Sequence, residues 1–306
     1  MTGSFPTNHD MADRLDEVGH LMGQQNGHRF RVRAYHRAAA TVRALPRPID
    51  EVFAEGGLEA LEALPGVGES LARSIAQVLV MGRLPMLDRL RGESQPSRLF
   101  RSVPGIGPVL ARRIHEELGV ETLEELEVAA HDGRLERMGG IGVKRLTGIR
   151  DSLAHRLARI RRFPPRGVTP EPGVAELLDV DREYRQKVAT DELPRISPRR
   201  FNPRGEAWLP ILHTKRGSRS YTVLWSNTAR AHELGKTGDW AILYADGPGG
   251  ERQYTVITSR FGPLRGQRIV RGREQECIAL YESLEDGPGA SGRPRPRDRG
   301  GSREPL

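Results

Sequence analysis

Three short glycine-containing segments of the sequence could bind phosphate groups. Each has two glycines on either side of one aliphatic residue, and each stands at the start of a predicted helix. Because glycine has no Cβ, an anion can approach the backbone closely at these points. The free N–H groups of a helix N-terminus and the positive end of its dipole favour a bound phosphate. The glycine pairs are Gly66 and Gly68, Gly105 and Gly107, and Gly140 and Gly142.

The repetition of the segment is more informative than any one copy. A single copy is equally well explained as a tight turn between packed helices. Three copies, each followed by aliphatic residues at helical spacing, favour repeated contacts to a nucleic-acid backbone. This is the pattern of the helix-hairpin-helix motif. We therefore predict DNA as the partner, with further backbone contacts from Arg73, Arg112 and Lys144.

The charge of the 306-residue chain agrees with a polyanionic partner. The formal net charge is +8 and the isoelectric point is about 10.1. Of 48 basic residues four are lysine, and the first is Lys144. Arginine forms forked contacts with phosphate oxygens, although an arginine-rich genome explains the proportion equally well. The charge favours nucleic acid without identifying it.

The remaining composition narrows the class of protein. Cys277 is the single cysteine, which rules out an internal disulfide framework and a cysteine zinc site. The first ten residues are polar, mean hydropathy is −0.55, and no apolar run reaches membrane-spanning length. We predict a cytoplasmic, nucleoid-associated protein that does not bind membranes. Nothing in the sequence identifies a protein partner.

The pattern of apolar residues predicts a multidomain fold, with an all-α half followed by an α+β domain. Helical spacing continues through the three hairpins, and Thr122 and Glu125 are placed as a capping box. Short apolar or alternating runs then predict mainly antiparallel strands, with a helix at Thr228–Leu234 between them and a hairpin loop at 246–250. The predicted strands are Trp208–His213, Ser220–Ser226, Trp240–Ala245 and Gln253–Ser259. The predicted units are a helical domain with the first hairpin at 10–92, a tandem hairpin domain at 93–163, a proline-rich linker at 164–173, an α+β domain at 174–285 and a disordered tail at 286–306.

The helical half resembles X-family DNA polymerases, the repair enzymes similar to DNA polymerase beta and its bacterial relatives. The likeness covers roughly residues 10–160 and implies that two modules grip the DNA backbone on either side of a gap or nick. It also implies a monovalent cation that bridges hairpin carbonyls and a phosphate. The segments similar to the amino-terminal domain are Phe30–Ala39, Leu64–Gly68 and Met81–Leu84, and those similar to the next domain are Val103–Ile114, Leu118–Leu126 and Met138–Ile149.

The resemblance also implies a pocket for a 5′-phosphate on the basic second helix. Its predicted residues are Arg31, Arg33, Tyr35 and Arg37. A solvated arginine face explains the same residues equally well. With this pocket, the protein would prefer gapped or nicked DNA or duplex ends.

Two departures from the family pattern argue against its activities. Ser74 stands where lyase-active members have the lysine that forms a Schiff base, and Ser70 stands at the nearby basic position. Serine has no amine for this chemistry. Asp179-Val180-Asp181 is the one Asp-x-Asp in the chain, and we interpret it as two carboxylates on a polar helix rather than as a metal site. We predict neither lyase nor polymerase activity.

The C-terminal half leaves two functions open. The favoured one is a DNA-repair accessory protein without catalytic residues. Its only expected cofactor is the monovalent cation that the family resemblance implies. The alternative is a metal-dependent nuclease with a site around His213, His232 and Asp239. The sheet could also bind nucleic acid through stacking aromatics and arginines, although strand aromatics are more often part of the core. The residues predicted for such a surface are Trp208, Tyr221, Trp225, Trp240, Arg216, Arg219, Arg265, Arg268, Arg271 and Arg273.

Overall fold

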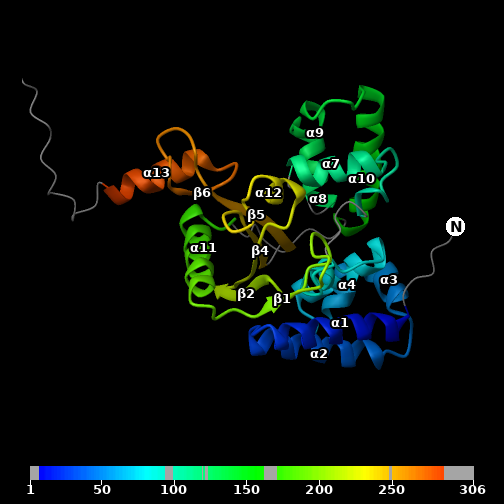
Figure 1. Ribbon diagram of the computed structural model, residues 1–306. Helices are drawn as coiled ribbons and strands as arrows, with labels where there is room; N and C mark the ends of the chain where they lie inside the picture. The colour runs from blue at the N-terminus through cyan, green and yellow to red at the C-terminus, as the bar shows by residue number, and fades with distance from the viewer. Residues whose placement is uncertain are drawn as a thin grey trace, which may run out of the picture.

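The computed structural model describes residues 7–93, 99–118, 120, 123–161, 171–247 and 250–285. Figure 1 shows a first helical module, a second helical module, and a domain with a central sheet. The predicted tail at 286–306, most of the predicted linker and Thr122 of the predicted capping box lie outside the described residues. Within the described residues, no helix is both long and apolar enough to cross a membrane.

The first module contains five helices around the first hairpin. Helix α1 begins after Thr7, whose hydroxyl forms a reciprocal capping box with Asp10. Two buried alanines on the facing side of α2 let α1 and α2 approach closely. The helices are α1 (Asn8–Gln24), α2 (Arg29–Arg43), α3 (Ile49–Glu62), α4 (Glu69–Met81) and α5 (Pro85–Leu90). The buried residues between α1 and α2 are Met11, Leu15, Val18, Met22, Tyr35, Ala38, Ala39 and Val42.

The second module carries the other two hairpins and has an apolar core of its own. Pro108 opens α7, a position that proline favours because the first helical N–H has no intrahelical acceptor. Ile106 and Ile114 are buried with Ile149 and Leu153 of the long last helix. The elements are α7 (Pro108–Leu118), α8 (Leu123–His131), α9 (Arg134–Arg137) and α10 (Val143–Arg161).

The C-terminal domain is built on a six-stranded antiparallel sheet in which the strands follow one another in chain order. One helix precedes the sheet, one interrupts it and one follows it. The elements are α11 (Val174–Ala189), β1 (Arg195–Ile196), β2 (Leu209–Arg216), β3 (Arg219–Trp225), α12 (Ala229–Glu233), β4 (Ala241–Gly247), β5 (Gly250–Thr258), β6 (Arg268–Val270) and α13 (Glu274–Glu285).

Both faces of this sheet are covered. On β4, Leu243 points toward the cluster that includes α11 and Cys277 of α13. Its neighbours Ile242 and Tyr244 join the core of the first helical module. Successive strand residues point to opposite faces, so a strand buried on both sides is apolar without alternation. In Figure 1, α11 lies to the left of the strands and the first module lies below them.

The predicted fold class is confirmed, with local differences. Strands β1 and β6 and the short helices α5 and α9 were not predicted, because elements of two to six residues carry little periodicity. The 12-residue helix α13 was also missed. Thr228 is the N-cap of α12 rather than part of the helix, and its side chain accepts from the Ala231 N–H. Asp246 and Gly247 belong to β4 rather than to a loop, and Asp246 lies opposite Glu251. The first helical module and the sheet also share one apolar core, although the sequence suggested separate domains.

Candidate nucleic-acid interface

The first hairpin is tied to α2 by side chains. Gly66 has φ +79°, a left-handed conformation that favours glycine. A Cβ there would lie 2.5 Å from Cδ of Arg37, so this arginine packs directly over the turn. The Thr41 hydroxyl donates to the Pro65 carbonyl at 2.7 Å. Gly68 is the N-cap of α4 and cannot cap it with a side chain, which leaves the first N–H groups open to a ligand.

The second and third hairpins also present open glycines. Gly105 and Gly140 have φ +87° and +76°, so a side chain at either position would strain the backbone. At Gly107 and Gly142, a Cβ would meet no atom within 4 Å. An anion can therefore reach the backbone at these two positions. Beside them, Val109 and Val143 are exposed by 61% and 77%, although aliphatic side chains usually avoid water.

Two arginines brace these hairpins against each other. Nε of Arg145, on the helix after the third hairpin, donates to the Gly105 carbonyl of the second hairpin at 2.7 Å. Arg113, on the helix after the second hairpin, donates to the Met138 and Gly139 carbonyls at 2.6 and 3.3 Å. The carbonyl oxygens of Gly105, Met138 and Gly139 thus accept hydrogen bonds from arginine guanidinium groups. The monovalent cation implied by the family resemblance stays a prediction.

The cationic side chains predicted to contact DNA differ in availability. Arg112 and Lys144 are exposed in the second module, and neither forms an ion pair with a described residue. Arg73 on α4 is 13% exposed and is held by Glu69 at 3.1 Å. Of these three predicted contacts, the two without an ion pair among the described residues therefore lie in the second module.

The residues of the predicted 5′-phosphate pocket face two directions. Arg33 and Arg37 are exposed. Tyr35 is buried, with its hydroxyl 3.3 Å from the sulfur of Met86. Arg31 points toward the sheet and binds Asp246 at 2.5 Å. In this arrangement a phosphate at Arg31 would compete with a carboxylate of the same chain.

A partly buried polar cluster includes Ser70 and Ser74, the positions where the family resemblance implies amines in lyase-active members. The Ser70 hydroxyl lies 2.8 Å from the Asp246 carboxylate, and the Ser74 hydroxyl donates to the Ser70 carbonyl. Burial raises the pKa of the Asp246 carboxyl, an effect that the charge of Arg31 opposes. The C-terminal sheet therefore covers this face of α4.

A second buried arginine reinforces this contact. Arg89 of α5 forms a bidentate pair with Glu251 of β5 at 2.9 and 2.6 Å. Its guanidinium also lies 3.3 Å from the ring centroid of Tyr244 on β4. A planar guanidinium suits both interactions, because it combines a forked donor with a face that stacks on aromatic rings. The contact between α5 and the sheet is thus both ionic and aromatic.

His213, a predicted nuclease residue, is a structural histidine at the same contact. Gln25 Nε2 donates to the Leu90 carbonyl, which turns Gln25 Oε1 toward His213 Nε2 at 3.3 Å. Nε2 must then carry the proton, and Nδ1 accepts from the Thr222 hydroxyl at 3.1 Å. Burial, aided by Arg31 and Arg89, lowers the pKa of His213 to about 3. Both ring nitrogens are used, so neither is free for a metal.

The other two predicted metal ligands are engaged elsewhere. His232 Nε2 lies 2.6 Å from Asn227 Oδ1. Asp239 accepts from Arg268 at 2.7 Å and from the Thr258 hydroxyl at 2.6 Å. No group of three or more His, Cys, Asp or Glu side chains suited to a metal occurs among the described residues. The structure therefore does not bring His213, His232 and Asp239 together as a group that could hold a metal.

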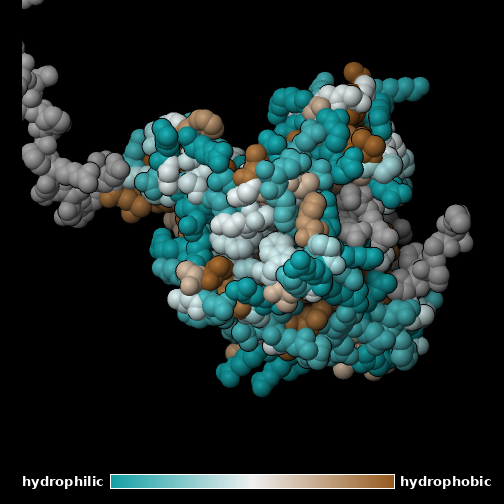
Figure 2. All heavy atoms as spheres, viewed as in Figure 1, coloured by the Kyte–Doolittle hydropathy of each residue, from teal (hydrophilic) through white to brown (hydrophobic). Residues whose placement is uncertain are grey.

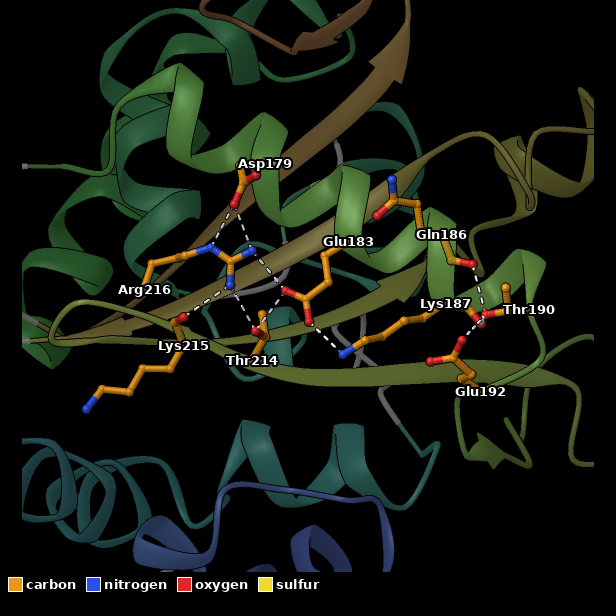
Figure 3. Close-up of polar contacts among 9 residues, drawn as sticks. All are labelled: Asp179, Glu183, Gln186, Lys187, Thr190, Glu192, Thr214, Lys215 and Arg216. Carbon is orange, nitrogen blue, oxygen red and sulfur yellow. Dashed lines mark hydrogen bonds and ion pairs between the residues drawn. The ribbon is translucent and has the colours of Figure 1, made fainter.

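Ion pairs and packing use several residues of the predicted nucleic-acid surface on the sheet, whereas Arg265 and Arg271 are exposed. Tyr221 is fully buried, and Trp225 packs against Tyr184 with ring centroids 4.7 Å apart. Figure 3 shows Arg216 turned toward Asp179 and Glu183 of α11, while the neighbouring Lys215 side chain points away. The other ion pairs that use predicted surface residues are Arg219 with Glu176, Arg268 with Asp181 and Asp239, and Arg273 with Glu276.

The Asp-x-Asp pair lies on a helix, as predicted. Asp179 and Asp181 are both on α11, and two residues of helix turn their side chains away from each other. Asp179 binds Arg216 of β2, whereas Asp181 is 1% exposed and receives two hydrogen bonds from Arg268 of β6. Both carboxylates attach the helix to the sheet.

The face of the molecule shown in Figure 2 is largely hydrophilic. Figure 2 shows apolar side chains in small separate groups on this face rather than in one continuous patch. Large apolar side chains exposed among the described residues are Phe30, Val109, Val128, Val143, Phe201, Leu234, Phe261 and Leu284. Two of them, Val109 and Val143, adjoin the open glycines of the second and third hairpins.

Comparison with known protein families agrees with this arrangement. Residues 6–84 match the family described as Helix-hairpin-helix domain. Residues 97–155 match the family described as SAM-like Helix-hairpin-helix tandem. The N-terminal half is built from helix-hairpin-helix domains.

Curated relatives match the same half. DNA polymerase/3'-5' exonuclease PolX of Bacillus subtilis (strain 168) is 24% identical over 156 residues, which are 51% of this chain and 26% of that protein. DNA polymerase lambda of Arabidopsis thaliana is 28% identical over 96 residues, 31% of this chain and 17% of that protein. The chain therefore spans about a quarter or less of the length of these relatives. The predicted resemblance to the helix-hairpin-helix region of X-family polymerases is confirmed.

Sequence reasoning missed the residues that join the modules. Asp246 is 215 residues from Arg31 and 176 from Ser70. No local spacing could pair them. A usable signal was present in β4, where the apolar run Trp240–Ala245 continues into Asp246. A carboxylate that extends a strand buried on both faces must find a partner.

Proposed function

We propose that this protein binds the phosphate backbone of gapped or nicked DNA or of duplex ends, without sequence preference. It would act as a repair accessory without polymerase or Schiff-base lyase activity, at the nucleoid in the cytoplasm. The observation that carries the proposal is the pair of braced hairpins with open backbone at Gly107 and Gly142. Exposed Lys144 and Arg112 supply charge beside them. Phosphate contacts of this kind position a protein without reading bases.

The absence of lyase activity is proposed from Ser70 and Ser74, which have hydroxyls where the chemistry needs an amine. Ser70 is also bonded to Asp246 beneath the sheet. Borohydride trapping with abasic DNA and primer extension should both give no product with the pure protein. No observation among the described residues favours the nuclease alternative, and incubation of labelled gapped DNA with magnesium or manganese tests it directly.

The binding proposal is tested with the full chain by fluorescence anisotropy on intact, nicked and gapped duplexes, with and without a 5′-phosphate. Affinity should fall steeply as salt rises, because bound phosphates release counterions. The Gly107→Ala/Gly142→Ala variant should bind about tenfold or more weakly, since each methyl blocks a charged hydrogen bond to the backbone. Its melting temperature should hold, because neither Cβ meets another atom.

Gly148→Ala is the matched control for these variants. Gly148 lies on α10, and a Cβ there also meets no atom within 4 Å. This variant should keep full affinity. Absence of DNA binding by the wild type at low salt would refute the proposal. Equal affinity for intact and gapped duplexes would refute only the structural preference, and equal affinity with and without the 5′-phosphate would refute only the pocket.

A further inference from the structure

The loop between β1 and β2 holds an exposed phenylalanine in an unusual backbone conformation. Phe201 has φ +53°, a region that residues with a side chain rarely adopt, and it is 46% exposed. Its ring lies 4.5 Å from the ring of His232. The Arg200 guanidinium lies 5.0 Å from the same ring. A strained backbone that presents an aromatic ring to solvent indicates a functional role rather than packing.

The loop is ordered by its own hydrogen bonds. The Ser197 hydroxyl donates to the Gly205 carbonyl at 2.7 Å. The Asn202 side chain donates to the Glu206 carbonyl and accepts from the Glu206 N–H. The Phe201 ring is therefore held in place, which lowers the entropy that a ligand must overcome on binding.

This loop meets all three parts of the protein. The Arg199 N–H donates to the Gly92 carbonyl after α5 at 2.8 Å. Arg200 pairs with Glu116 of α7 at 3.3 Å, and the Arg200 carbonyl accepts from Asn227 before α12. In Figure 1 the segment between β1 and β2 lies between the two helical modules. Glu116 is eight residues along α7 from Pro108, about 12 Å from the second hairpin.

The surroundings of the ring suit a nucleobase. The Asn227 amide is oriented by its bond to the Arg200 carbonyl, so its oxygen faces His232 Nε2 and fixes the proton there. Burial lowers the pKa of His232, with help from Arg200, which keeps this backing ring neutral. Arg199 and Arg204 are exposed on either side of Phe201, and Arg199 pairs with no described carboxylate. An aromatic ring flanked by arginines is the arrangement that binds single-stranded nucleic acid by stacking.

We propose that Phe201 stacks on an unpaired nucleobase of DNA whose backbone is held by the second and third hairpins. This inference rests on the proposed DNA binding and adds the site for the unpaired strand. The strand would pass from the phosphate at Gly107 along α7 toward the ring, by way of Glu116 and its partner Arg200. The exposed arginines then bind the flanking phosphates.

The first test compares affinities of the full chain for intact duplex and for duplex with a short single-stranded gap. Phe201→Gly removes the ring and relieves the backbone conformation, so this variant should fold. We expect about a tenfold loss of affinity for the gapped DNA and an unchanged affinity for intact duplex. Phe201→Trp should retain gap affinity. Phe261→Ala is the matched control, since Phe261 is also exposed, at 83%, but lies in the loop after β5, away from this junction.

The second test locates the contact. Gapped DNA with 5-iododeoxyuridine in the single-stranded stretch is irradiated with the wild type, and the crosslinked peptide is identified by mass spectrometry. A crosslink at Phe201 supports the proposal. Crosslinks confined to other segments, or equal losses for intact and gapped DNA in Phe201→Gly, overturn it and leave a protein-binding role for the loop. If the wild type binds intact and gapped DNA equally, the stacking proposal fails while backbone binding stands.

Discussion

The first hairpin and the tandem hairpins share one motif but have different surroundings. In the first, α4 begins with Glu69, and the adjoining Ser70 lies beneath the sheet, where it binds Asp246. In the second and third, Pro108 and Val143 take the place of that glutamate. A carboxylate favours a helix N-terminus but repels a phosphate there. The first hairpin thus docks the C-terminal domain, and under the proposed DNA binding the tandem pair would be the main DNA-binding surface.

The largest expected effect comes from breaking the contact at the first hairpin. Asp246→Ala should lower the free energy of unfolding by about 3 kcal/mol, because it leaves the Arg31 charge buried without its partner. Urea denaturation of the variant and the wild type measures this loss. Arg31→Met/Asp246→Leu serves as the control, since removal of both charges should restore most of the stability. An unchanged denaturation midpoint in Asp246→Ala would show that the contact does not stabilise the fold.

Acid should weaken the same contact through His213. Its pKa in the folded protein, about 3, lies below the ordinary value near 6.5. The unfolded chain takes up the proton as pH falls through 6.5, whereas the folded protein does not. The contribution of His213 to the free energy of unfolding is thus fully present above pH 6.5 and is lost progressively down to about pH 3. Between pH 6.5 and pH 5, protonation of this one group in the unfolded chain should lower the free energy of unfolding by about 2 kcal/mol.

The measurement for His213 is the free energy of unfolding at pH 7.5 and pH 5. His213→Asn should be less stable than the wild type at pH 7.5, yet it should lose less between the two values. The remaining histidines are common to both proteins, so they cancel in the comparison. If the two proteins lose equal stability on acidification, His213 is not the neutral residue described here.

Much of the fold could be predicted from the sequence because its signals are local. The inner faces of α1 and α2 follow from residues three and four apart, and the hairpins follow from paired glycines. The contacts of the candidate site were harder to predict, because they join side chains that are far apart in the sequence. His213 was a reasonable metal ligand until its neighbour 188 residues away, Gln25, was known. Arg145 likewise reaches the Gly105 carbonyl 40 residues away.

The smallest expected effect separates the two kinds of hairpin directly. Gly68 has φ −95° and ψ 177°, and a Cβ there meets no atom within 4 Å, so Gly68→Ala should fold normally. Its DNA affinity should change by less than about twofold, because Glu69 already disfavours a phosphate there. Anisotropy titration beside Gly107→Ala/Gly142→Ala makes the comparison. A loss at Gly68 as large as that of the double variant would mean that all three hairpins grip DNA alike.

The arginine contacts between the tandem hairpins should make affinity depend on how many linked phosphates a ligand carries. Arg145 and Arg113 each reach across to the other hairpin's carbonyls, which fixes the spacing of the two open turns. Under the proposed DNA binding, the two turns would each hold one phosphate of the same strand. Once one phosphate is bound, the next would already be at high effective concentration. A free mononucleotide gains nothing from this geometry, whereas a polymer with matching phosphate spacing gains the full benefit of both turns.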